Sequence, residues 1–74
     1  MSNEEILKNF VERIEELRKE KGYDYITLSR KSGVPLTTLL NIVKGNSKNP
    51  TLYTIVKLCA GFEVTPAEFF RTEE

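Results

Sequence analysis

The chain has 74 residues, 39% of them hydrophobic and 30% charged, which is the composition of one folded globular domain. Its 11 basic and 11 acidic side chains balance, so the overall basic surplus common among nucleic-acid-binding proteins is absent. With no histidine and one cysteine, Cys59, the sequence excludes the usual zinc sites, histidine bases and catalytic triads. We therefore expect no metal, no cofactor and no catalytic residue.

The charges are distributed unevenly along the chain. Residues 1–21 hold six acidic and five basic side chains, residues 22–50 hold one and four, and residues 51–74 hold four and two. The middle third therefore carries a net charge of +3 between flanks of −1 and −2. A local basic surface of this kind is what contact with phosphate groups requires.

The longest apolar runs are only three or four residues, too short for a membrane span or the core of a secretory signal. We therefore expect a cytoplasmic protein that does not contact a membrane. A cavity of several hundred Å3 would consume the core of so small a domain, so we also expect no small-molecule ligand.

The first predicted element is a helix over residues 3–21. Ser2 and Glu5 have the spacing of a capping box, in which each side chain bonds the other residue's backbone N–H. Gly22 suits the left-handed conformation that ends a helix. Between these signals, apolar residues recur at helical spacing: Ile6, Leu7, Phe10, Val11, Ile14 and Leu17. We expect the charged face of this helix to be solvated.

Two short helices are predicted next, over residues 25–32 and 35–44. Asp24 can cap the first, and Pro35 suits the start of the second. Two helices crossing at about 90–120° need a tight turn and a close contact. Gly33 can adopt the positive φ of such a turn, and Ser29 is small enough to let the second helix pass close by. This spacing predicts a helix-turn-helix motif.

The last two predicted helices cover residues 51–60 and 66–71. Thr51 can cap the first, which Gly61 is expected to end, and Thr65 with Glu68 forms a second capping box. The expected apolar face of the first comprises Leu52, Ile55, Val56, Cys59 and Ala60. No segment alternates like a strand, so the sequence predicts an all-α fold of five helices.

Three segments resemble the Xre/Cro family of phage-repressor-type helix-turn-helix domains: RIEELRKEKGY at 13–23, KSGVP at 31–35 and KGNSKNPTLYTIVKLCAGFEVTPAEFF at 44–70. The resemblance implies a five-helix, lambda-repressor-like DNA-binding domain over residues 1–74, whose second and third helices form the helix-turn-helix. It also implies that the chain is not an enzyme and that the third helix lies in the major groove of double-stranded DNA.

The resemblance places the base-contacting positions near the start of the third helix, at Leu36, Thr37, Leu40 and Asn41. Asn41 has the donor and acceptor that read adenine, while Thr37 and Leu36 suit a thymine methyl group. The expected phosphate contacts are Tyr25, Lys44, Asn46, Lys48 and Asn49, together with backbone N–H groups near Gly45. The alternative for Thr37 and Asn41 is ordinary exposed helix surface.

Two readings of function remain open, because Leu36 and Leu40 place apolar side chains on the supposed base-reading face. The first is a sequence-specific transcriptional regulator, most simply a repressor that occupies a pseudo-palindromic operator. The alternative is a protein-interaction module, such as an anti-repressor or an antitoxin-like partner-binding domain, since an exposed apolar pair also suits a protein partner.

The C-terminal aromatic residues are expected to contribute to self-association. The family's C-terminal helices often form a two-fold interface, and this chain has Phe62, Phe69 and Phe70 there. We expect a homodimer that uses part of this set, so that two recognition helices face successive major grooves about 34 Å apart.

Overall fold

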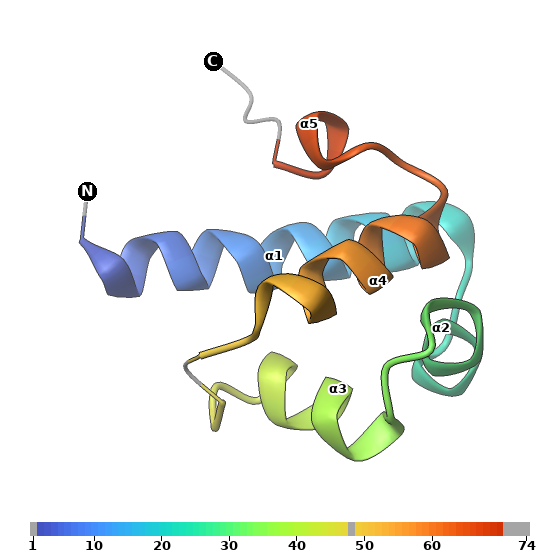
Figure 1. The fold of residues 1–74 in the computed structure, drawn as a ribbon, viewed down its shortest axis with the longest axis horizontal. Helices are drawn as coiled ribbons and strands as arrows, with labels where there is room; N and C mark the ends of the chain where they lie inside the picture. Colours follow the sequence, from blue (N-terminus) through green and yellow to red (C-terminus); the bar gives the residue numbers. More distant parts are fainter. Residues whose placement is uncertain (1, 48, 71–74) are drawn as a thin grey trace.

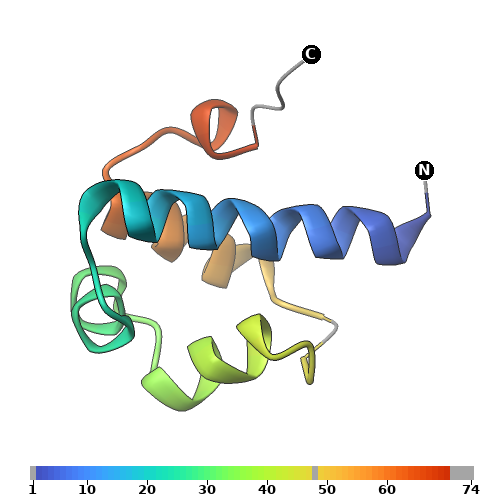
Figure 2. The ribbon, with the colours of Figure 1, turned by 180° about the vertical axis from the view of Figure 1, so that it is seen from behind.

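This computed structural model describes residues 2–47 and 49–70, which form five helices joined by turns and loops and contain no strand (Figures 1 and 2). They are α1 (Asn3–Lys21), α2 (Tyr25–Ser32), α3 (Leu36–Val43), α4 (Leu52–Phe62) and α5 (Pro66–Phe69). In both views α5 lies on one side of α1, and α2 and α3 lie on the other. The predicted all-α fold of five helices is confirmed.

The predicted helix bounds agree with the structure at α1 and α2 and differ by one or two residues elsewhere. Helix α3 is one residue shorter at each end than predicted, because Pro35 and Lys44 are its caps. Helix α4 begins one residue later and ends two residues later. Helix α5 ends at Phe69, and residue 71, where it was predicted to end, lies outside the described residues.

Side-chain caps fix where four of the helices begin. The Ser2–Glu5 capping box starts α1, Asp24 accepts a bond from the Thr27 N–H, and Thr51 accepts one from the Thr54 N–H. A second capping box, between Thr65 and Glu68, starts α5. Each cap satisfies backbone N–H groups that have no partner within the helix.

One apolar core joins the five helices. It consists of Phe10, Ile14, Leu17, Leu28, Val34, Leu39, Ile42, Leu58, Cys59, Phe62 and Phe69. Burial raises the pKa of the Cys59 thiol, so this side chain stays neutral and behaves as a small apolar group. None of the helices in the described ranges has the length and apolar character needed to cross a membrane.

The buried face of α4 differs from the predicted one. Leu52 and Val56 were predicted to be buried, but they are 76% and 47% exposed. The helix continues to Phe62, and its buried side chains are Leu58, Cys59 and Phe62. Helix α4 is therefore rotated from the predicted orientation, and the rotation removes the whole Phe62 ring from water, which is favourable.

Gly61 does not end α4, contrary to prediction, but allows α2 and α4 to cross closely. A Cβ atom at Gly61 would lie 2.7 Å from the Cβ of Ser32 and 2.8 Å from its Cα. Glu63 adopts the left-handed conformation after the helix instead, with φ of 60°. The tight α2–α4 contact sets where α2, and therefore the following turn and α3, lie.

Helix α5 is held against α1 by Arg13. Its Nε donates to the Phe69 carbonyl at 2.7 Å, and its Nη2 donates to the Glu68 carbonyl at 2.8 Å. The Phe69 ring lies 5.6 Å from that of Phe10 and 6.3 Å from that of Phe62. Arg13 was predicted to be solvated, but it satisfies carbonyl groups at the end of α5.

Candidate nucleic-acid interface

The turn between α2 and α3 is fixed by side-chain hydrogen bonds. Ser29 Oγ donates to the Val34 carbonyl at 2.6 Å, and the buried Ser32 Oγ accepts from the Val34 N–H at 3.1 Å. Gly33 has φ of 79°, as predicted, and its N–H donates to the Ser29 carbonyl. With its backbone groups bonded on both sides, the turn holds α3 at a set angle to α2.

Helix α3 lies at the edge of the molecule opposite α5, with α1 between them (Figures 1 and 2). Leu39 and Ile42 are fully buried and anchor it to the core. By helical geometry, Thr37, Asn41 and Lys44 lie at the centre of the opposite face, and all three are exposed. The face that the sequence assigned to base reading is therefore the outer face of α3.

The two edges of this outer face differ in chemistry. Leu36, which is 36% exposed, and the partly buried Leu40 lie along one edge. Thr38, which is not among the predicted base-contacting residues, lies along the other edge and is exposed. The side chains of Thr37 and Asn41 form no hydrogen bond with any residue in 2–47 or 49–70, so their polar atoms are available to a ligand.

The residues after α3 supply part of the predicted phosphate surface. Asn46 and Asn49 are exposed, and Lys48 lies outside the described residues. The predicted use of backbone N–H groups near Gly45 is wrong. The N–H groups of Asn46 and Ser47 both donate to the Asn41 carbonyl, at 2.9 and 3.1 Å. The Gly45 N–H donates to the Ile42 carbonyl at 3.1 Å. These groups cap α3, as helix ends require.

Tyr25 is engaged within the protein. Its hydroxyl donates to Glu15 Oε2 at 2.9 Å, and the Arg18 guanidinium lies 4.3 Å from its ring centroid. Arg18 also bonds Glu15 at 2.8 Å, which lowers the pKa of that carboxyl, while burial and the bond to Glu15 raise the pKa of the Tyr25 hydroxyl. The single hydroxyl proton is given to a charged carboxylate, so this arrangement leaves Tyr25 without a donor for phosphate.

Two further basic side chains lie at the end of α2. Arg30 and Lys31 are both exposed, and the Lys31 Nζ lies 5.3 Å from the Tyr23 ring centroid. Their position in the last turn also suits the helix dipole. They add positive charge to the helix that precedes α3.

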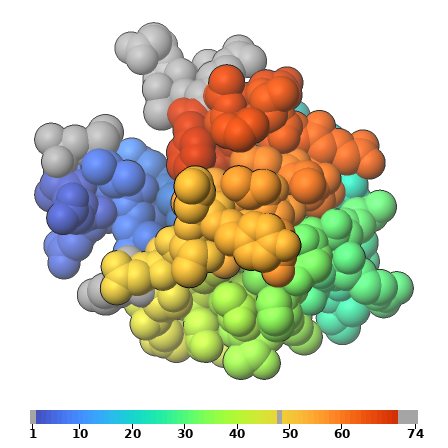
Figure 3. Space-filling view, in the orientation of Figure 1, coloured from blue at the N-terminus to red at the C-terminus, as the bar shows by residue number. Residues whose placement is uncertain are grey.

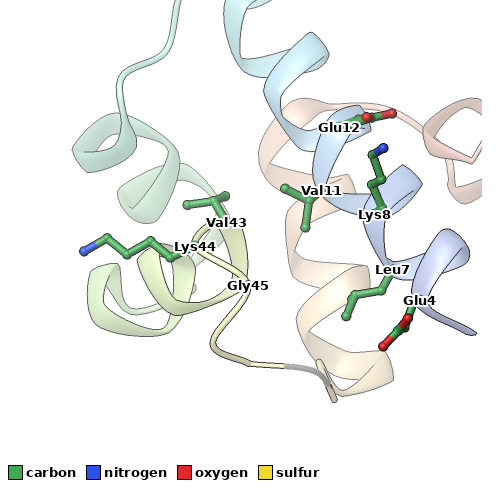
Figure 4. Close-up of a pocket in the computed structure, with 8 residues that line it drawn as sticks. All are labelled: Glu4, Leu7, Lys8, Val11, Glu12, Val43, Lys44 and Gly45. Carbon is green, nitrogen blue, oxygen red and sulfur yellow. The ribbon is translucent and has the colours of Figure 1, made fainter.

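A surface groove of about 370 Å3 separates the first half of α1 from the end of α3 (Figure 4). Leu7, Val11 and Val43 face this space, whereas Lys44 extends away from α1. The groove is also lined by Glu4, Lys8 and Glu12, so its rim carries both signs of charge. Such a mixed rim does not select one ligand chemistry.

The three C-terminal phenylalanines have different environments. Phe62 and Phe69 are fully buried, and Phe70 is 48% exposed and stacks on Phe10 at 6.2 Å. Buried rings offer no surface to a second subunit. Of the three phenylalanines predicted to lie in a dimer interface, Phe70 is therefore the one whose ring a second subunit could contact. Three residues of the predicted apolar helix faces are also exposed: Ile6 on α1, and Leu52 and Val56 on α4, beside Tyr53.

Comparison with protein families gives a match to a helix-turn-helix family model over residues 14–69, from within α1 to the end of α5. Neither the comparison with curated proteins nor that with solved structures gave a match. The matched segment includes the α2–α3 motif, every core residue except Phe10, and the outer face of α3. The fold is lambda-repressor-like and all-α. The chain belongs to the Xre/Cro-like helix-turn-helix family of DNA-binding regulators.

Proposed function

We propose that the protein is a sequence-specific repressor that inserts α3 into the major groove of a pseudo-palindromic operator and blocks polymerase by occupying the site. One observation carries this proposal: Leu39 and Ile42 fix α3 to the core, while Thr37 and Asn41 face solvent with no hydrogen-bond partner among the described residues. A rigid helix with free polar side chains near its first turns suits base reading.

The proposed contacts divide into base reading and phosphate binding. Leu36, Thr37, Leu40 and Asn41 contact base edges, with the Asn41 carboxamide bonded to adenine N6 and N7. Lys44, Asn46, Lys48 and Asn49 contact phosphate groups, and Tyr25 is left out because of its bond to Glu15. Positive charge at Lys44, with Arg30 and Lys31 at the end of α2, supports affinity despite a net charge of zero.

Asn41→Ala and Lys44→Ala test these two roles. Asn41→Ala is expected to cost about 1–3 kcal/mol at the best operator and to relax the preference at one base pair. Lys44→Ala is expected to weaken binding to all sequences by a similar factor. It should also reduce the slope of log binding constant against log salt concentration by about 1. Fluorescence anisotropy with a selected duplex measures both effects.

Matched controls for this test come from α1, where Asn9 and Lys19 are also exposed. Asn9→Ala and Lys19→Ala should leave affinity unchanged. Equal effects of Asn9→Ala and Asn41→Ala would show that α3 is not the base-reading helix.

The proposed dimer uses the exposed apolar face of α4 together with Phe70. On α4, Leu52 is 76% exposed and Tyr53 is 68% exposed, and Val56 is the next residue along the same face. Figure 3 shows α4 at the centre of one side of the molecule. A second copy is the fitting partner, because a two-fold operator needs two copies and an isologous contact needs one self-complementary face.

Self-association through this face gives a concentration-dependent mass. Light scattering of the wild type is expected to show a dimer at high micromolar concentration, and Tyr53→Glu is expected to give a monomer that keeps the helical circular dichroism signal. A wild-type monomer at that concentration would contradict the dimer. The same face supports a second candidate function, docking of a different protein, which Asn41→Ala and Lys44→Ala would leave intact.

A further inference from the structure

We infer that α3 reads its operator mainly through the C5 methyl groups of pyrimidines, so that the protein selects A·T-rich half-sites and distinguishes 5-methylcytosine from cytosine. This inference rests on the proposed function, in which α3 enters the major groove. It identifies the class of base pair that the groove must present.

The outer face of α3 lacks the usual ligands for guanine. Guanine is most often read by a bidentate bond from arginine or lysine to O6 and N7. Residues 36–43 contain no arginine, lysine, glutamine or acidic residue. Lys44 follows the last turn of α3, away from the N-terminal turns that approach the bases in this motif. A G·C pair facing the start of α3 would therefore meet no arginine or lysine side chain to bond guanine O6 and N7.

The apolar edge of α3 suits thymine instead. Leu36 and Leu40 are one helical turn apart, and Thr37, whose side chain carries a methyl group, is exposed beside them on the outer face. The thymine C5 methyl is the apolar group that base pairs present in the major groove. Placing the leucines over a C·G pair would instead remove water from the cytosine N4 amino group without replacing its hydrogen bonds, which is unfavourable.

Asn41 adds one directional contact to this apolar surface. Its carboxamide is exposed and bonds none of the described residues, so both its donor and its acceptor remain available for adenine N6 and N7. Adenine and the methyl group of thymine lie on opposite strands of the same kind of base pair. The hydrogen-bonding and apolar parts of α3 therefore favour the same A·T composition.

The chemistry of this readout extends to modified DNA. The base 5-methylcytosine carries a methyl group at the same ring position as thymine, whereas uracil is thymine without it. A surface that recognises the methyl group will discriminate within each of these pairs of bases. At the positions that face Leu36 and Leu40, a duplex with thymine should bind more tightly than one with uracil. A duplex with 5-methylcytosine there should bind more tightly than one with cytosine.

The experiment uses the full chain and a duplex selected from a random pool, with single thymines replaced by uracil. Competition anisotropy is expected to show a loss of about fourfold for each contacted methyl group, the value for one buried methyl-sized group. A second pair of duplexes carries cytosine or 5-methylcytosine in place of the same thymines. The duplex with 5-methylcytosine is expected to bind more tightly than the duplex with cytosine by a similar factor.

Variants of the protein assign the effect to the apolar edge. In Leu36→Ala the thymine-to-uracil affinity ratio should fall towards one, while Asn41→Ala should lower affinity and keep the ratio. Ile6→Ala, at an exposed aliphatic residue of α1, should change neither. Because each ratio is measured within one variant, partial unfolding cancels from it.

Two results would overturn the inference and leave DNA binding intact: equal affinity of the wild type for thymine and uracil duplexes, or selection of half-sites dominated by G·C pairs. Failure to prefer any duplex sequence would overturn the proposed function itself. The two failures are therefore distinguishable in the same experiment.

Discussion

Phe62→Ala will lower the free energy of unfolding by about 3–5 kcal/mol, the usual cost of removing a buried ring. The Phe62 side chain is fully buried, and its ring centroid lies 6.2 Å from that of Tyr23 and 6.3 Å from that of Phe69. A domain of this length has a total stability of only about 4–11 kcal/mol. Thermal denaturation followed by circular dichroism should show a Tm that falls sharply or a chain that does not fold.

Phe70→Ala is the matched control, because the Phe70 ring is half-exposed at the same end of the molecule. Its effect on the stability of the monomer should be much smaller. If Phe62→Ala kept the wild-type Tm and only shifted the monomer–dimer equilibrium, Phe62 would belong to an interface and the core described above would be incorrect.

Gly61→Ala is expected to destabilise the protein by about 1–3 kcal/mol, although alanine is the better helix former by about 1 kcal/mol. The new Cβ would lie 2.8 Å from the Cα and 2.9 Å from the N of Ser32, and these backbone atoms cannot rotate away. Helix α2 would have to move from α4. Urea denaturation measures the change in stability.

Glu63→Gly serves as the companion variant two residues later. Glu63 has φ of 60°, which costs energy for a residue with a Cβ, so glycine should stabilise the fold by about 0.5–1 kcal/mol. The two substitutions are therefore expected to change the free energy of unfolding in opposite directions. If Gly61→Ala raised stability, as at an ordinary exposed helix position, the close α2–α4 contact would be contradicted.

Local signals made the starts of the helices predictable from the sequence. The caps at Ser2, Asp24, Thr51 and Thr65 each join residues three positions apart, and all four form as expected. Such contacts depend only on nearby chain geometry. The outer face of α3 was predictable for a similar reason, because helical periodicity separates it from Leu39 and Ile42.

The role of Gly61 and the rotation of α4 were not predictable from local signals. Glycine both ends helices and permits close helix contacts, and only the position of Ser32 decides between these roles. Helix α4 also has apolar residues on more than one face, so its buried side depends on which neighbours it meets. Both answers require the relative placement of α2 and α4.

Long-range polar contacts set the remaining differences from prediction. Tyr25 bonds Glu15 ten residues away, and Arg13 bonds the Phe69 carbonyl 56 residues away. The charge pattern of α1 gave no sign of either partner, because solvated and bonded side chains have the same helical spacing. The Tyr25 contact matters for the interface, since it removes one expected phosphate ligand.

Selection from a randomised duplex pool at two salt concentrations tests whether paired α3 helices read a two-fold DNA site. We expect an enriched A·T-rich pseudo-palindrome, with half-site centres about 10 base pairs apart and an affinity that falls steeply with salt. Binding without an enriched sequence, or no binding at either salt concentration, would contradict it.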